Sequence, residues 1–379
     1  MSKRRTRPKS QSAAVSTLTG RWIALSILFA VTLAAYWNSF GAPLVFDDLA
    51  TIQRNTSVRF GEFYWNLLSA RSVLYLTFTL NYIWSGQQVW SYHLINFLLH
   101  LLNGLFIFVL AERIFGHVDS SLQRCRLYAV LAAAFFLVHP VQTESVTYIS
   151  SRSELLSTCF YLLGFLVYVM WPKERIGFLC SLAVAVPYFF GLGSKETVIS
   201  LPVTIFLYDF LFLSKGEFKS LLPRWRFYLT YLVGGLSAAY YILTVALRGS
   251  VGAGTAGRLS SWHYFLTQLR VIAFYYIRLI FVPVGQNLDY DFGASRSPFE
   301  PAVIASFLFL CGIVFLGWIL RRRSPVFAFS IFWFFVTLAP TSSVVTILDV
   351  IFEHRLYLPL VGVCISFPLF IQLVYGKLR

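Results

Sequence analysis

The sequence predicts an all-α polytopic membrane protein. Hydrophobic residues make up 58% of the 379 positions and charged residues only 12%, whereas a soluble domain has about 25% charged residues. Apolar runs long enough to cross a bilayer recur along the whole chain. Most of the basic excess lies in every second connection between these runs. Together these observations exclude a soluble enzyme and an enzyme held by a single anchor.

Ten apolar runs predict about 10 transmembrane helices. A basic tail, residues 1–19, precedes the first run and should stay in the cytoplasm, because Lys and Arg favour that side. The first run lacks a small-residue cleavage site and ends in Tyr36-Trp37, so we interpret it as an anchored span and not as a signal peptide. The predicted spans are 20–38, 91–111, 127–148, 155–171, 176–193, 197–213, 227–247, 302–320, 325–340 and 357–375.

The charges predict that both termini are cytoplasmic. With this topology the cytoplasmic segments and adjoining span ends hold twenty Lys and Arg against five Asp and Glu, and the other side holds eleven of each sign. The whole net charge of +15 therefore lies on one side, as the positive-inside rule requires. A basic patch for nucleic acid would not divide in this way, so a nucleic-acid partner is excluded.

One apolar segment, residues 258–283, is predicted to be a surface or re-entrant helix on the outer face. If it crossed the membrane, the basic residues after it would move outside. Arg270 and Arg278 are eight positions apart and share a helix face, as a surface helix requires. The alternative is an ordinary span with its arginines buried against other helices. Residues 20–379 then form a single transmembrane domain with a long first outer loop, 39–90.

The acidic pair Asp47-Asp48 is the first candidate functional feature, because carboxylates close to a membrane span are costly and usually functional. The alternative is a turn that caps the next helix. Most other acids and bases also fall at the outer ends of spans or in outer loops. They are Arg71, His139, Glu144, Arg152, Glu154, Lys195, Glu196, Asp289, Asp291, Glu353, His354 and Arg355.

The second predicted span carries a polar stripe. His93, Asn96, His100 and Asn103 share one helix face, and hydrogen bonding between helices is the alternative to a functional role for them. A transporter should place its polar groups near the membrane midplane, so the outer position of most of them favours a reaction at the membrane surface. No phosphate-cradling glycine loop is present, which argues against a nucleotide donor. The five scattered cysteines show no zinc-binding spacing. No cofactor is predicted, and a divalent metal stays open.

An ordered series of motifs, spread over residues 20–375, resembles the transmembrane and tetratricopeptide-repeat O-mannosyltransferases. The chain ends at Arg379, without tetratricopeptide repeats. The motifs are Phe46-Asp47-Asp48, Leu76-Thr77-Phe78, Leu80-Asn81-Tyr82, Tyr92-His93-Leu94-Ile95-Asn96 with His100, Val138-His139-Pro140-Val141 with Glu144, Tyr148-Ile149-Ser150-Ser151-Arg152-Ser153-Glu154, Ser194-Lys195-Glu196, Leu288-Asp289-Tyr290-Asp291, Pro340-Thr341-Ser342-Ser343 and Phe352-Glu353-His354-Arg355-Leu356-Tyr357-Leu358-Pro359.

The resemblance implies a GT-C glycosyltransferase fold. Such enzymes transfer a sugar, here with mannose as a candidate, from a polyprenyl- or dolichyl-phosphate donor to an acceptor hydroxyl. The acceptor would be a protein Ser/Thr or a glycan, and an acid of the first outer loop would be the base. Eukaryotic members of the family act in the endoplasmic reticulum, but the departure from their repeat-containing pattern favours the prokaryotic cytoplasmic membrane, with the endoplasmic reticulum as the alternative. The active site is expected to face outward among membrane lipids.

The residue chemistry fits this reaction. Asp47 or Asp48 can take the proton of the acceptor hydroxyl, and related enzymes favour Asp47. The leaving phosphate needs cations or hydrogen-bond donors, for which the candidates are Arg355, His354, Arg152, Lys195 and Arg71. Substrate-binding or orienting roles are predicted for Glu144, Glu154, His139, Glu353, Asp289, Asp291 and His93.

Direct transfer with one base predicts inversion at the anomeric carbon. A ligase that transfers a whole lipid-linked glycan, and a flippase or transporter of lipid-linked sugars, are the alternative functions. For Glu353 and Arg355 the alternative is a structural salt bridge that fastens the last helix.

Overall fold

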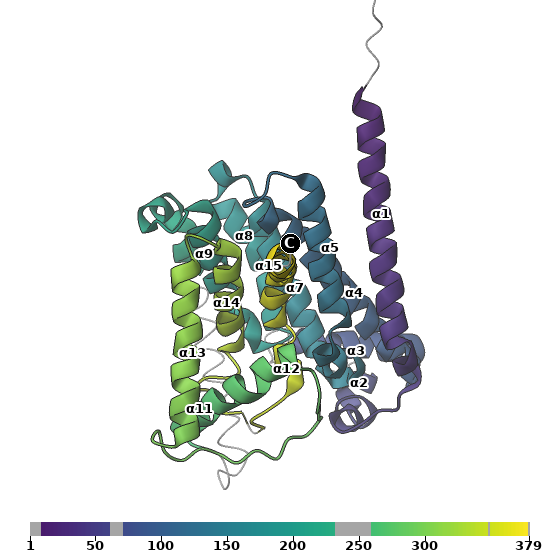
Figure 1. Cartoon of the computed structure of the whole chain (residues 1–379). Helices are drawn as coiled ribbons and strands as arrows, with labels where there is room; N and C mark the ends of the chain where they lie inside the picture. Colours follow the sequence, from purple (N-terminus) through teal and green to yellow (C-terminus); the bar gives the residue numbers. More distant parts are fainter. Residues whose placement is uncertain (1–8, 61–70, 232–258, 348, 378–379) are drawn as a thin grey trace, which may run out of the picture.

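The computed structural model describes residues 9–60, 71–231, 259–347 and 349–377, and within these ranges every regular element is a helix (Figure 1). The prediction of an all-α polytopic membrane protein is confirmed. Several sequence predictions fall outside the described residues, namely the first eight residues of the basic tail, residues 61–70 of the first outer loop and most of the predicted span 227–247.

Six helical segments of the described chain are long and apolar enough to cross a membrane, or seven if α5 (Leu122–Val138) and the bent piece after it form one span. Five of the six coincide with predicted spans. The six segments are Trp22–Gly41, Val89–Phe115, Ile149–Met170, Glu196–Leu213, Ser261–Phe281 and Pro301–Leu320. Three shorter apolar helices, Phe178–Leu192, Pro325–Leu338 and Leu360–Tyr375, coincide with three further predicted spans.

The bundle is centred on α4 (Val89–Phe115) and α7 (Arg152–Met170). The helix α4 packs against α5 and α7, and α7 packs against α8 (Phe178–Leu192). On the other side, α14 (Pro325–Leu338) and α5 both pack against α15 (Leu360–Lys377). Small residues permit the close approaches that membrane helices need. A Cβ at Gly362 of α15 would lie 2.8 Å from the Ser330 carbonyl oxygen of α14.

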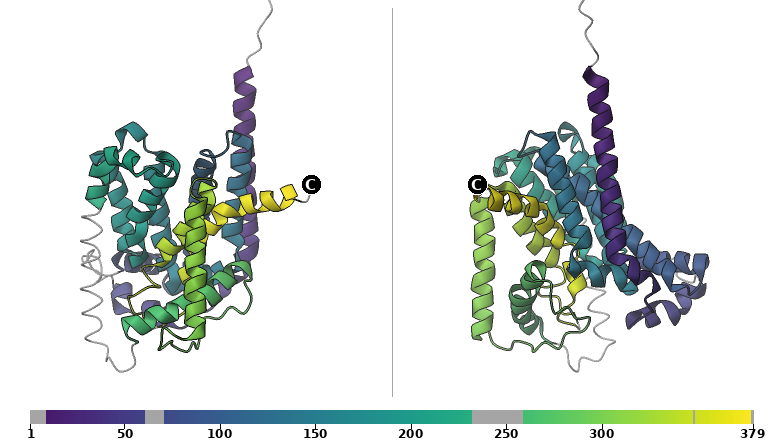
Figure 2. Two further views of the ribbon diagram at one scale, coloured as in Figure 1. Left: turned by 60° about the vertical axis from the view of Figure 1, so that its left-hand side comes forward. Right: turned by 45° about the vertical axis from the view of Figure 1, so that its right-hand side comes forward.

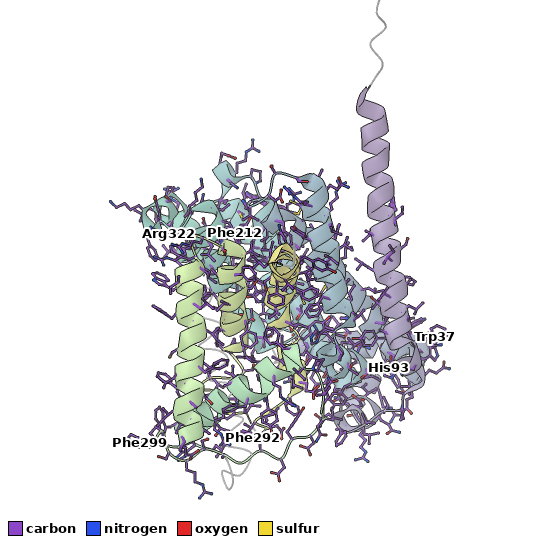
Figure 3. The ribbon with its side chains drawn as sticks, in the orientation of Figure 1. Trp37, His93, Phe212, Phe292, Phe299 and Arg322 are labelled. Atoms are coloured by element: carbon purple, nitrogen blue, oxygen red, sulfur yellow. The ribbon has the colours of Figure 1, made fainter. Side chains whose placement is uncertain are left out.

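The two ends of the bundle differ in composition. Figure 3 shows Trp37, His93, Phe292 and Phe299 at the lower end and Phe212 and Arg322 at the upper end. The lower end of the bundle is defined by four helices, α2 (Thr56–Phe60), α3 (Ser72–Ser85), α11 (Ser261–Arg270) and α12 (Ile277–Phe281). The sequence predicts that Trp37, His93, Phe292 and Phe299 face outward and that Arg322 is cytoplasmic. These outward-facing residues lie at the opposite end of the bundle from Arg322, which agrees with that prediction.

The segment from α11 to α12, which passes through a wide π-type turn at Val271–Tyr276, is continuous and runs obliquely across the lower end (Figures 1 and 2). The helix α13 (Pro301–Leu320) stands upright beside it. Arg270 donates hydrogen bonds to Gly293 O at 3.3 Å and Ser295 Oγ at 2.8 Å in the lower-end loop. Length and apolarity would allow this segment to cross, so its surface or re-entrant position stays a prediction.

Candidate functional site

The first outer loop presents its two carboxylates differently. Phe46 takes a positive φ of 46°, and the turn that it makes leaves Asp47 exposed and Asp48 only 1% exposed. Asp48 Oδ1 accepts hydrogen bonds from the backbone and hydroxyl of Ser150, at 2.7 and 2.6 Å, and Oδ2 accepts one from Val45 N at 3.3 Å. Burial raises the pKa of Asp48 above its ordinary value.

Asp47 is joined to the rest of the protein through its backbone. Its N–H donates to Tyr148 Oη at 3.0 Å, so Tyr148 and Ser150 together hold the acidic loop against the segment that precedes α7. The carboxylate that the loop exposes is therefore that of Asp47, and Asp48 fixes the loop from below. Of the two predicted bases, Asp47 has the accessible side chain.

A chain of four polar side chains lies beside this loop. Glu144, on the short helix α6 (Thr143–Thr147), contacts His354 twice: Oε1 pairs with Nδ1, and Oε2 accepts the backbone N–H at 3.0 Å. His354 Nε2 lies 3.9 Å from Glu154 Oε1, and Glu154 forms an ion pair with Lys195. The structure thus brings together four predicted site residues from four separate parts of the sequence.

Three cations act on His354, namely Lys195 within the cluster and Arg71 and Arg355 beside it. Burial, and then the positive charge of Lys195, lower the pKa of His354 to about 3, and Arg355 and Arg71 act in the same direction. His354 is therefore a neutral imidazole at pH 7. Arg71 is exposed, and its backbone is left-handed, with φ 61°. Arg71 is accordingly the predicted phosphate ligand with the most accessible charge.

Arg355 is occupied by the protein itself. Its guanidinium donates to Asp349 O at 2.6 Å, Val350 O at 3.1 Å and Tyr264 Oη at 3.3 Å. These bonds hold the loop before the short turn Glu353–Leu356 against α11. The predicted bidentate phosphate clamp would require the guanidinium to leave these carbonyls.

Glu353 does not orient an arginine in the structure, and the predicted salt bridge to one is not formed among the described residues. Its carboxylate accepts hydrogen bonds from Asn287 N at 2.8 Å, Gln286 Nε2 at 2.7 Å and the Tyr290 hydroxyl. Glu353 therefore fastens the lower-end loop 284–291 over the cluster. Glu353 does not meet Arg355 because the Arg355 side chain points towards α11.

Arg152 has a structural role in place of the predicted phosphate contact. It is fully buried and donates to Asn96 Oδ1 at 2.8 Å, Asn81 Oδ1 at 2.9 Å and Tyr92 O at 3.1 Å. Its guanidinium also lies 4.5 Å from the centre of the Phe78 ring. Neutral acceptors and an aromatic face thus satisfy the charge inside the protein, and they join α3 and α4 to α7.

The polar stripe on α4 is mostly interhelical hydrogen bonding, the alternative given above. His100 bonds to Tyr357 Oη at 2.8 Å and Leu137 O at 3.0 Å, and Asn103 donates to Leu155 O at 3.0 Å. His93 lies close to Asp48 and bonds through Nε2 to Ala42 O at 3.1 Å, while its buried Nδ1 has no hydrogen-bond partner. Of this stripe, only His93 adjoins the acidic loop.

The remaining predicted residues lie at the edges of the site. His139 ends α5 and bonds to Ile280 O at 2.9 Å and Val141 N at 3.2 Å, so it ties α5 to α12. Asp289 and Asp291 are exposed on the lower-end loop and do not enter the cluster. Between them, Tyr290 turns inward to Glu353. Among the described residues no group of three or more His, Cys, Asp or Glu is arranged to hold a metal ion.

A large apolar cavity of about 660 Å³ opens next to the polar cluster. It lies between α5, α12, α13, α14 and α15, and its lining is almost entirely hydrocarbon and aromatic, including the stacked pair Phe135 and Phe367. His139 and Pro140 form the end of the cavity nearest the cluster, because Glu144 follows them on the next turns of the chain.

The sequence interpretation missed several residues of the site. Tyr148 and Ser150 hold the acidic loop, and Gln286, Asn287 and Tyr290 hold Glu353. Of these, Tyr148, Ser150 and Tyr290 stand inside motifs already noted, so proximity to those motifs was the available signal. Gln286 and Asn287 precede the Leu288-Asp289-Tyr290-Asp291 motif and carried no signal of their own.

The chain is similar to several animal protein O-mannosyl-transferases. The chain is 34% identical to the human protein O-mannosyl-transferase TMTC3 over 160 residues, which are 38% of this chain and 16% of the relative. A Caenorhabditis elegans protein O-mannosyl-transferase is 25% identical over 366 residues, 90% of this chain and 50% of the relative. Protein O-mannosyl-transferase Tmtc2 of Drosophila melanogaster is 29% identical over 305 residues, 72% of this chain and 31% of the relative.

The matched parts thus span half or less of these relatives, all of which are animal proteins and lend no support to a prokaryotic membrane. No family model and no solved structure matches. The alignment with the Caenorhabditis elegans protein extends over most of the chain. The chain is therefore a relative of the transmembrane and tetratricopeptide-repeat O-mannosyltransferases.

Proposed function

We propose that this protein is a glycosyltransferase that moves a sugar from a polyprenyl-phosphate donor to a hydroxyl group of a protein on the outer face of a membrane. Mannose is the first sugar to test, and a protein the first acceptor, because the relatives are named protein O-mannosyl-transferases. Transfer is direct, so the anomeric carbon inverts.

One observation carries the proposal: a single segment, residues 139–150, touches all the parts that such a reaction needs. Its first residues, His139 and Pro140, line the apolar cavity. Glu144 then contacts the polar cluster through His354. Tyr148 and Ser150 hold the acidic loop. Contiguous parts of the protein thus offer an apolar cavity for a long hydrocarbon tail, cations for a phosphate, and a base.

The cavity suits the isoprenoid tail of the donor. Removing hydrocarbon from water or from competing lipid contacts requires a matching apolar lining, and the cavity offers such a lining. At its polar end, Lys195 and Arg71 supply the positive charge that meets the phosphate, and both act on His354. Electrostatic stabilisation of the leaving phosphate is the largest contribution that these cations can make.

The transfer step uses Asp47. The acceptor hydroxyl gives its proton to the Asp47 carboxylate as its oxygen attacks the anomeric carbon. The bond between that carbon and the phosphate oxygen breaks, and polyprenyl phosphate leaves with the electron pair of the broken bond. Asp48 keeps the loop in place through Ser150 and Val45.

The test is reconstitution of the purified protein in lipid nanodiscs with radiolabelled mannosyl-phosphoryl lipids and a panel of acceptor proteins. Label should move from donors with long polyprenyl tails to protein, and a nucleotide sugar should give none. Label that moves only from a nucleotide sugar would contradict the proposal.

The cavity is tested separately with Ser366→Trp, which fills it from α15. This variant should raise KM for a long-tailed donor and leave KM for a farnesyl donor close to that of the parent. Leu373→Trp is the matched control, because Leu373 lies on the same helix and is 55% exposed. Equal effects of the two substitutions would remove the cavity from donor binding.

A further inference from the structure

We propose that His354 recognises a hydroxyl group of the donor sugar through Nε2, which makes it a specificity-determining residue. This inference rests on the proposed function and names the contact that selects the sugar. It replaces the expectation from the sequence that His354 binds the donor phosphate.

The imidazole ring of His354 is held in one orientation. Both carboxylate oxygens of Glu144 face this residue, one at Nδ1 and the other at the backbone N–H. The Phe352 ring stacks against the imidazole, with centroids 4.6 Å apart and planes 24° apart. Burial raises the pKa of Glu144 to about 7, and the backbone N–H groups of His354 and Glu353 oppose this shift. In its ionised form, which predominates above that pH, the Glu144 carboxylate only accepts hydrogen bonds, so Nδ1 carries the proton and donates it to Glu144.

Nε2 of the neutral ring is consequently a lone-pair acceptor. In the described part of the chain no group donates a hydrogen bond to it. Glu154 Oε1 lies 3.9 Å away and is itself an acceptor, already paired with Lys195. The His354 side chain keeps 14% of its surface accessible, which leaves Nε2 available to a donor from outside the protein.

The chemistry of this site selects a hydroxyl group and rejects a phosphate oxygen. The non-bridging oxygens of the ionised donor phosphodiester have only lone pairs and would oppose the lone pair of Nε2. Protonation of the ring would remove this conflict, but burial and the neighbouring cations hold the pKa of His354 near 3. A sugar hydroxyl can donate to Nε2 and accept from the Lys195 ammonium at the same time. No phosphate oxygen offers this combination.

The first test uses the parent protein and a series of mannosyl-phosphoryl lipids, each with one sugar hydroxyl replaced by hydrogen. At one ring position kcat/KM should fall by about tenfold or more, because the deoxy sugar leaves Nε2 unpaired in a closed site. A parent protein that accepts every deoxy donor as well as the full sugar would overturn the proposal.

The second test compares two variants. His354→Asn keeps a nitrogen close to Nδ1 for Glu144 and removes Nε2, so discrimination at that one ring position should disappear while the other positions keep theirs. His354→Gln places an amide near the position of Nε2 and should restore part of the discrimination. A purely structural histidine would lower activity with all donors equally and would leave the ratios unchanged, which would contradict the proposal.

Binding of polyprenyl phosphate without a sugar separates the two roles of His354. By isothermal titration in nanodiscs, His354→Asn should bind this lipid as tightly as the parent. Weaker binding would return His354 to the phosphate and overturn the inference. If no lipid-phosphate sugar is a substrate of the parent protein, the proposed function itself has failed, and this outcome is distinct from the failure of the hydroxyl contact.

Discussion

Replacing Asp47 by Asn should abolish transfer and leave the fold intact, whereas the same change at Asp48 should lower stability. The Asp47 side chain is exposed, so its substitution should change the free energy of unfolding by less than about 0.5 kcal/mol. Loss of a general base lowers the rate by about 10²- to 10⁴-fold. The amide keeps the shape of the side chain and removes its capacity to take a proton.

The magnitude at Asp48 follows from its three hydrogen bonds. An Asn amide can keep its oxygen on Ser150, but its NH₂ group then faces Val45 N–H, two donors against each other. An unsatisfied buried group of this kind costs about 1–3 kcal/mol. Asp48→Asn should therefore unfold at a lower temperature than both the parent and Asp47→Asn.

Initial rates with a radiolabelled lipid donor, and thermal unfolding of the same nanodisc samples, measure both effects. Turnover of Asp47→Asn at the rate of the parent would refute the assignment of the base. Unchanged thermal stability of Asp48→Asn would show that the loop does not depend on its buried carboxylate. The two variants differ by one position in the chain, so each is the matched control of the other.

Three further predictions concern topology, Arg355 and pH. In a Cys311→Ser background, which removes the exposed cysteine, a membrane-impermeant thiol reagent should label Asp291→Cys from outside and Arg322→Cys only after permeabilisation; the reverse pattern would invert the predicted topology. Arg355→Lys should lower the unfolding temperature, because lysine cannot keep both carbonyl contacts; weaker donor binding with unchanged stability would instead support the phosphate clamp. Burial and neighbouring cations hold the pKa of His354 near 3, below its ordinary value of about 6.5. Between these two pH values the unfolded chain binds more protons than the folded protein, so the free energy of unfolding decreases as the pH falls through this range. Thermal unfolding of His354→Asn between pH 7 and 4 should show a smaller decrease than the parent, and an equal decrease would contradict the shift.

The sequence allowed the bundle to be predicted because hydrocarbon length and the asymmetry of basic charge act over a whole helix. Nine of the ten predicted spans coincide with helical segments of the described residues. The tenth, 227–247, lies mostly outside the described residues. The fold was less predictable where helices bend. The break of 51° after Val138, which brings Glu144 to the cluster, depends on the turn at His139-Pro140 and on contacts with α12.

The residue types of the site were predictable, but their pairing was not. Glu144 and His354 are 210 positions apart, and no spacing rule joins residues at that distance. The same limit explains Arg152, which the sequence placed with the phosphate ligands and the structure places among the amides of Asn81 and Asn96. An arginine at the outer end of a span has the same appearance in the sequence whether it faces a ligand or a neighbouring helix.

The balance of charge around His354 explains how a buried polar cluster can be both stable and reactive. The carboxylates of Glu154 and Glu196 offset part of the positive charge of Lys195, Arg71 and Arg355 before a substrate arrives. An unpaired charge so close to hydrocarbon would be strongly destabilising. In the proposed reaction the phosphate gains negative charge as the glycosidic bond breaks, and cations already held in position would respond to it without reorganisation. Interactions that strengthen only at this point raise the rate and do not merely tighten binding. The ion pair between Lys195 and Glu154 is such a preorganised contact, because it fixes the ammonium beside His354 while leaving its remaining hydrogens for the substrate.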